Sequence, residues 1–170
     1  LYDLIKHNGD FNHLFVFTSI IQRATKTNRF RYGGTGGLSG TLYIPSLSVE
    51  RNIFQLFNNK LRDVSKMKRF IKTLESIINT GSMTEITNIK TSSIDYIFTD
   101  PPFGANLNYS ELSYIWETWF KNLTNNSLEA IINDVQQKGL VEYQSLMTQC
   151  FKEYYRVLKP NRWMTVEFSN

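Results

Sequence analysis

One short run, Asp100-Pro101-Pro102-Phe103-Gly104, holds the residues best suited to chemistry. Its two prolines fix two φ angles and lack amide donors, so the run forms a stiff platform that presents carbonyl acceptors. The carboxylate of Asp100 and the carbonyl of Pro101 could each accept one N–H of an amine, while the Phe103 ring stacks on a planar group. Gly104 lets another group approach the backbone closely. The bare tripeptide Asp-Pro-Pro is equally typical of an ordinary turn after a strand.

Two acceptors beside a stacking ring suit the methylation of an exocyclic base amine. The lone pair of such a nitrogen is delocalised into the ring, and it must be freed before it can attack a methyl group in line. Acceptors on both N–H groups favour a more tetrahedral nitrogen. A paired base must first be extruded, because its amine is otherwise tied up in the duplex. Beyond Gly104, the side chains of Asn106, Asn108 and Tyr109 could contact this substrate.

The residues before Asp100 predict the strand that positions the platform. Residues 94–99, Ile-Asp-Tyr-Ile-Phe-Thr, form a nearly continuous apolar, aromatic and β-branched run. This composition is typical of a strand buried on both faces of a parallel sheet. Ligands of open α/β sheets gather beyond the carboxyl ends of the strands, which is where Asp100 lies.

The residues after the platform predict two helices and a second strand. A helix is expected over 112–123, and Asn108 with Glu111 could form its capping box. Another helix is expected over 143–158, stopped by Lys159-Pro160-Asn161, and a strand over 163–168. The order strand, helix, helix, strand predicts an α/β domain.

Residues 1–80 predict a helical region that precedes this domain, which we expect over 81–170. Helices are indicated over 11–24 and from Val49 towards Ile78, where the pattern is expected to break once. Between them, the glycines of residues 32–40 predict a mobile loop. Basic side chains on the second helix could contact phosphates, although a solvated face is the more ordinary interpretation: Lys60, Arg62, Lys66, Lys68, Arg69 and Lys72.

Composition predicts a globular, cytoplasmic protein without a membrane partner. The chain has 41% apolar and 14% aromatic residues, but no run of about 18 to 20 apolar residues and no leader pattern. Its net charge of +4 permits a polyanionic partner. The single cysteine, Cys150, and two histidines make neither an internal disulfide nor a zinc set, and Cys150 is expected in the core. The sequence opens with Leu1, and we expect it to be an excerpt of a longer protein.

With its flanks, the platform resembles the fourth motif of the amino-group DNA methyltransferases, (Asp/Asn/Ser)-Pro-Pro-(Tyr/Phe). Residues 92–104 resemble that family's entry into this strand, and residues 155–163, Tyr-Arg-Val-Leu-Lys-Pro-Asn-Arg-Trp, are similar to its later Arg-Val-Leu-Lys-Pro-Gly-Gly turn. Residues 39–48 also look like a subgroup of bacterial proteins labelled DNA methylases. The main resemblance extends from about residue 82 to residue 170.

This resemblance implies part of a Rossmann-like catalytic domain that methylates adenine N6 in DNA with S-adenosylmethionine. Asp100, Pro101, Pro102 and Phe103 would form its catalytic motif. Aspartate at the first position favours adenine, since serine is more usual in cytosine-N4 enzymes. DNA is then a partner, and a restriction or specificity subunit a further one. The alternatives are cytosine N4, an RNA base or a glutamine side chain as the target amine, or a non-catalytic module that binds DNA or a partner subunit.

The chain departs from the family where the cofactor should bind. The family's Asp-x-Phe-x-Gly-x-Gly motif is absent, and no apolar strand precedes the glycines of residues 33–37, which we interpret as a loop. The main binding motif for S-adenosylmethionine is expected outside this chain, which by itself need not be active. Glu85 matches an acidic position near the cofactor's adenine in related enzymes, and Glu85 and Asp100 are the candidate cofactor contacts. Asn161 replaces a usual glycine, which is tolerable because asparagine enters left-handed conformations.

Overall fold

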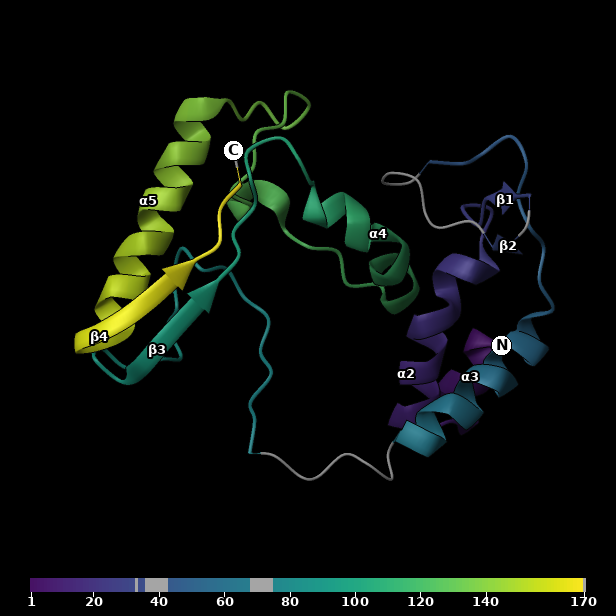
Figure 1. The fold of residues 1–170 in the computed structure, drawn as a ribbon. Coiled ribbons are helices and arrows are strands. Elements are labelled where there is room, and N and C mark those ends of the chain that lie inside the picture. Colours follow the sequence, from purple (N-terminus) through teal and green to yellow (C-terminus); the bar gives the residue numbers. More distant parts are fainter. Residues whose placement is uncertain (33, 36–42, 68–74, 170) are drawn as a thin grey trace. The chain divides into compact units, whose positions relative to one another are not determined.

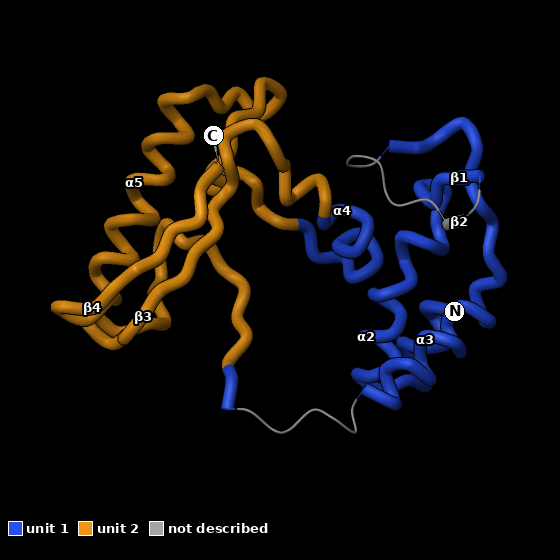
Figure 2. Tube along the Cα trace, viewed as in Figure 1, with its two compact units in different colours: residues 1–76, 113–123 blue, residues 77–112, 124–170 orange. Residues whose placement is uncertain are grey.

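A computed structural model describes residues 1–32, 34–35, 43–67 and 75–169 of the chain (Figure 1). The fold is mixed α/β and has two compact units (Figure 2). Unit 1 comprises residues 1–76 and 113–123, and unit 2 comprises residues 77–112 and 124–170. Helix α4, Tyr109–Phe120, contributes its first turn to unit 2 and its remainder to unit 1. The boundary expected near residue 80 stays a prediction of domain organisation.

Unit 1 is a helical cluster. It contains α1 (Tyr2–Asn8), α2 (Phe11–Ile20), the 3-10 helix η1 (Ile21–Ala24) and α3 (Ile53–Met67). The helix expected over 11–24 is therefore confirmed, with a tighter last turn. Asp10 caps α2 by accepting a hydrogen bond from the amide of His13 at 3.1 Å. The apolar core of the unit consists of Ile5, Val16, Phe17, Ile20, Ile21, Phe57 and Val64.

Helix α3 differs in length from its prediction. It begins at Ile53, where the side chain of Asn52 accepts a hydrogen bond from the amide of Gln55 at 3.0 Å. It is helical as far as Met67, and residues 75–78 are not helical, so the expected extension to Ile78 is wrong. Of the six basic residues assigned to this region, the last three lie outside the described residues.

The glycine-rich segment lies largely outside the described residues, at 33 and 36–42. Its described part forms a short antiparallel pair, in which β1 (Phe30–Arg31) lies beside β2 (Gly34–Thr35). The predicted mobile loop over 32–40 is therefore not tested as a whole.

Unit 2 is built on a parallel pair of strands with a helix packed against it (Figure 1). Strand β3 (Ile94–Thr99) pairs with β4 (Leu158–Val166), and the register places Tyr96 beside Trp163 and Thr99 beside Val166. Between the strands the chain forms the short 3-10 helix η2 (Asn126–Leu128) and helix α5 (Leu140–Val157). The expected α/β organisation is confirmed at this level. Strand β4 begins earlier than predicted, and Asn161 has the left-handed φ of 58° that its glycine-like position suggested.

Among the described residues of unit 2, one face of this sheet is covered and the other is not. Ile97 and Met164 pack against the core of the unit, which contains Ile86, Cys150 and Tyr154. Side chains alternate along a strand, so the opposite face carries Tyr96, Phe98 and Trp163, which are 55%, 61% and 80% exposed. The prediction that β3 is buried on both faces is therefore wrong. The reason is that the described residues supply only one covering layer, that of α5.

Burial in this core raises the pKa of the Cys150 thiol, and the side chain is 8% exposed, as expected of a core cysteine. None of the helices in the described parts of the chain combines the length and apolarity needed to cross a bilayer.

Candidate functional site

The platform follows the carboxyl end of β3 directly, as the sequence indicated. The main-chain carbonyl of Thr99 accepts a hydrogen bond from the amide of Glu167 at 2.9 Å, so strand pairing persists to the last residue before Asp100. The side chain of Asp100 is exposed, whereas Pro101 is buried. The platform thus begins at the edge where parallel α/β sheets bind their ligands.

The carbonyls that follow the Asp100–Pro101 pair each accept one hydrogen bond. The carbonyl of Pro102 accepts one from the Tyr143 hydroxyl at 2.7 Å, and that of Phe103 accepts one from the Asn106 amide at 3.1 Å. The carbonyl of Gly104 accepts one from the amide of Ile132 at 3.0 Å.

Within the described residues, the carbonyls of Asp100 and Pro101 receive no donor. Pro101 is a buried residue, and a main-chain acceptor without a partner is uncommon in such residues. Together with the Asp100 carboxylate, the Pro101 carbonyl gives the platform acceptors that are free to receive the N–H groups of a ligand.

Tyr143 is a site residue that sequence reasoning assigned only to the apolar stripe of its helix. It lies in the first turns of α5, is 8% exposed, and its hydroxyl reaches a carbonyl 41 residues away in sequence. The available signal was the residue type, since a buried tyrosine hydroxyl needs a hydrogen-bond partner. The periodicity of the helix does not say which partner it finds.

Phe103 packs against Phe168, which follows β4. The two rings meet edge to face, with centroids 5.3 Å apart and planes at 72°. Such a contact uses a face of only one ring, so at least one face of Phe103 is not engaged by Phe168. The predicted stacking role of Phe103 is sterically compatible with this contact and stays a prediction.

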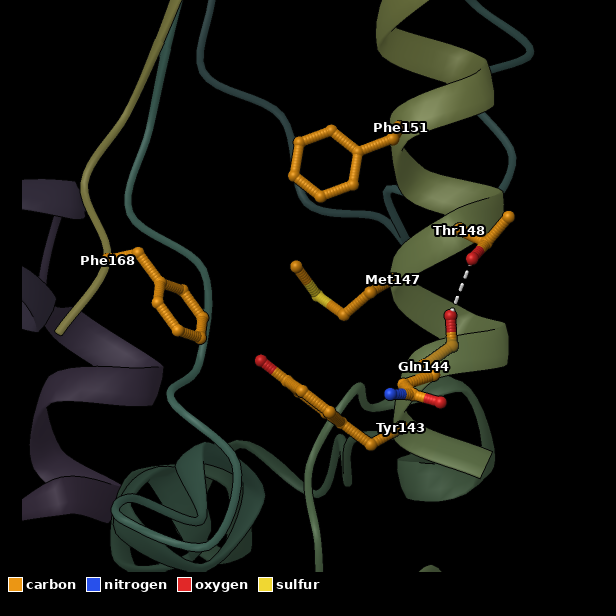
Figure 3. A pocket seen from close by; sticks show the side chains of 6 residues that line it. All are labelled: Tyr143, Gln144, Met147, Thr148, Phe151 and Phe168. Atoms are coloured by element: carbon orange, nitrogen blue, oxygen red, sulfur yellow. Dashed lines mark hydrogen bonds between the residues drawn. The ribbon is translucent and has the colours of Figure 1, made fainter. Parts of the chain in front are cut away.

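A pocket of about 430 Å³ opens beside the platform (Figure 3). Met147 and Phe151 extend from α5 towards Phe168, and the Tyr143 hydroxyl points the same way. Gln144 and Thr148 complete the lining, and the Thr148 hydroxyl donates to the Gln144 carbonyl at 2.7 Å. Two residues that line this pocket thus contact the platform: Tyr143 contacts Pro102, and Phe168 contacts Phe103.

The predicted substrate contacts after the platform differ in their surroundings. Gly104 has φ of +58°, which explains the glycine. The side chains of Asn106 and Tyr109 are exposed. The Oδ1 atom of Asn108 is buried without a hydrogen-bond partner within the described structure.

The expected capping box between Asn108 and Glu111 is therefore not formed. Glu111 Oε1 instead accepts a hydrogen bond from Asn133 at 3.3 Å. The start of α4 is held by Glu129, which accepts hydrogen bonds from the amide and hydroxyl of Ser110 at 2.8 and 2.6 Å.

The described residues do not complete a site for S-adenosylmethionine. Neither strand of unit 2 runs into a glycine-rich turn, because β3 is followed by Asp100 and β4 by Glu167. Glu85 is exposed, and none of its described contacts joins it to the platform. Its neighbour Ile86 is fixed, since the Ile86 amide donates to the Glu153 carboxylate at 2.9 Å. The candidate cofactor contacts thus stay separate predictions, and the residues present do not enclose the cofactor.

Comparison with known proteins adds no assignment: no family model matches the chain, and no curated protein or solved structure is detectably similar to it.

Proposed function

We propose that this chain is part of the Rossmann-like catalytic domain of a DNA adenine-N6 methyltransferase. The observation that carries the proposal is a pair of acceptors without a partner among the described residues, the Asp100 carboxylate and the Pro101 carbonyl, at the carboxyl end of a parallel strand. The carbonyls that follow them each accept a hydrogen bond already, which favours these two groups as ligand acceptors. The resemblance of residues 92–104 and 155–163 to the methyltransferase motifs suggests methyl transfer as the reaction.

In this proposal, the residues act on the amine of an extruded adenine. The Asp100 carboxylate and the Pro101 carbonyl each accept one N–H, which localises the lone pair on the nitrogen and directs it at the methyl group. The ring of Phe103 stacks on the purine through the face that Phe168 does not engage and holds its plane. The charge of Asp100 offsets the positive charge that develops on the nitrogen as it takes up the methyl group. The methylated amine then loses one N–H proton to solvent.

S-adenosylmethionine is the methyl donor that the resemblance implies. Because the described residues do not complete its site, we derive no step through it. The proposal predicts that segments outside the described residues, or another polypeptide, supply the cofactor half of the active site.

The test is incorporation of labelled methyl groups into DNA by the full-length protein and by two aspartate variants. Asp100→Ala is expected to lower kcat at least about a hundredfold, as the loss of an oriented charged acceptor does. Asp95→Ala is the matched control, because Asp95 is an exposed carboxylate at the other end of β3 and, in the described parts of the chain, pairs only with Lys159 and Arg162. Its kcat is expected to stay within about twofold of wild type.

Analysis of the modified nucleosides distinguishes adenine N6 from the other amines that could be methylated. N6-methyladenine in wild-type product supports the proposal, whereas N4-methylcytosine or a methylated RNA base moves the activity to another amine. Equal incorporation by Asp100→Ala and wild type would remove Asp100 from catalysis. Failure of the wild-type protein both to bind S-adenosylmethionine and to methylate DNA would favour a non-catalytic module.

A further inference from the structure

Two tyrosines of α5 contact the residues on either side of the Asp100–Pro101 pair. The Tyr143 hydroxyl donates to the Pro102 carbonyl at 2.7 Å, and the Tyr154 hydroxyl lies 3.3 Å from that of Thr99. Both side chains are 8% exposed. The Asp100–Pro101 pair therefore lies between two residues, Thr99 and Pro102, that α5 contacts.

We infer that Tyr143 is a positioning residue for this acceptor pair, an inference that rests on the proposed function. The proline rings fix two φ angles of the platform, so the direction of its carbonyls depends on a few ψ angles. The hydrogen bond anchors the Pro102 carbonyl and thereby restricts ψ of Pro102. Because the ring of Pro102 fixes its φ, this ψ angle sets the direction of the Pro101 carbonyl relative to the anchored one. The hydrogen bond also gives the neighbouring Pro102 carbonyl a donor, which leaves the Pro101 carbonyl as the more available acceptor of the two.

The hydrogen-bond lengths rank the two tyrosines. A distance of 2.7 Å is ordinary for an O–H···O bond, whereas 3.3 Å is long. Tyr143 also acts on the main chain of the platform itself, while Tyr154 reaches only a side chain of the preceding residue. The hydroxyl of Tyr143 should therefore matter more for the reaction than that of Tyr154.

Replacement by phenylalanine isolates the hydroxyl from the ring. Tyr143→Phe keeps the aromatic wall of the pocket and removes only the donor to Pro102. Tyr154→Phe removes the weaker contact at Thr99. Tyr155→Phe is the matched control, because Tyr155 lies on the same helix and is 85% exposed.

The experiment measures kcat and the KM for DNA of the full-length protein and of these three variants. Carbonyl ¹³C resonances of Pro101 and Pro102 are recorded in parallel. For Tyr143→Phe we expect both resonances to shift, kcat to fall at least about tenfold and KM to stay within about twofold. The reason is that misplaced acceptors slow the chemical step more than they weaken DNA binding. Tyr154→Phe should lose less activity, and Tyr155→Phe none.

The possible outcomes separate this inference from the function on which it rests. A wild-type protein that methylates DNA, together with a Tyr143→Phe variant of unchanged kcat, overturns the positioning role and leaves the function intact. A change confined to KM overturns it as well. A wild-type protein without methyl transfer overturns the function and this inference together. Should circular dichroism show that Tyr143→Phe does not fold, the wild-type protein decides through a deuterium isotope shift. A Pro102 carbonyl resonance that is the same in H₂O and D₂O shows no hydroxyl donor on this carbonyl and overturns the inference.

Discussion

Arg156 donates a hydrogen bond of 2.7 Å to the main-chain carbonyl of Ile86, which lies 70 residues earlier in the sequence. Its guanidinium also donates to the Ile89 carbonyl at 3.1 Å and to both carboxylate oxygens of Glu153, at 2.9 and 2.7 Å. Glu153 in turn accepts the Ile86 amide. This charged pair on α5 therefore fixes the segment that leads into β3 and hence the strand that ends at the platform.

Substitution of Arg156 should destabilise unit 2 more than loss of an ordinary surface arginine. Arg156→Met leaves the Ile86 and Ile89 carbonyls without this donor and the partly buried Glu153 carboxylate with only the Ile86 amide, and groups left unpaired in this way are costly. We expect the melting temperature to fall by roughly 4 °C or more. Arg162→Met is the control, because its ion pair with Asp95 joins two exposed side chains and should change the melting temperature by less than about 2 °C. Equal shifts in the two variants would contradict the special role of Arg156.

The same pair predicts how stability depends on pH. Hydrogen bonds from Arg156 and then from the Ile86 amide lower the pKa of Glu153 from 4.5 to about 2. Because the folded value lies below the unfolded one, the stabilisation is fully present above pH 4.5 and is lost as the pH falls towards 2. Urea unfolding between pH 2 and 7 should show this acid loss in wild type and a smaller one in Glu153→Gln. Parallel curves for the two proteins would refute the assignment.

The local parts of this unit could be predicted from sequence, and the contacts between them could not. The three-and-four spacing around Cys150 predicted α5, and the apolar run before Asp100 predicted β3. An apolar run does not say what will cover each face, so the exposure of Tyr96 and Phe98 was missed. The Tyr143–Pro102 contact was missed because it joins two segments that no single periodicity relates. Left-handed Asn161 was predictable because its conformation is a property of one residue.

Gly104 should tolerate alanine poorly. Its φ of +58° costs a residue with a side chain roughly 1 to 2 kcal/mol. An added Cβ would also lie 3.4 Å from Ile132 Cδ1, an ordinary contact, so the backbone and not a clash should set the cost. Gly81→Ala is the control, since nothing lies within 4 Å of its Cβ position. Urea unfolding should show the loss for Gly104→Ala and a change within about 0.5 kcal/mol for Gly81→Ala. Equal stability of both variants would contradict the strained conformation.

Asn108 should matter for substrate binding but not for stability. Its buried Oδ1 has no partner in the described structure, so its removal forfeits no hydrogen bond within the protein. If this oxygen accepts a hydrogen bond from the extruded nucleotide, Asn108→Ala should raise the KM for DNA about two- to tenfold while stability stays within about 0.5 kcal/mol.

Gln136 offers the matched comparison, because its Oε1 is the other buried side-chain oxygen without a partner in the described parts of the chain. Gln136 lies outside the platform and its predicted substrate contacts, so Gln136→Ala should leave both KM and stability unchanged. Steady-state kinetics and urea unfolding of the two variants measure both effects. A KM that responds equally to both substitutions would show that an unpaired buried oxygen does not by itself mark a substrate contact. A large loss of stability in Asn108→Ala would instead assign Asn108 to the support of α4.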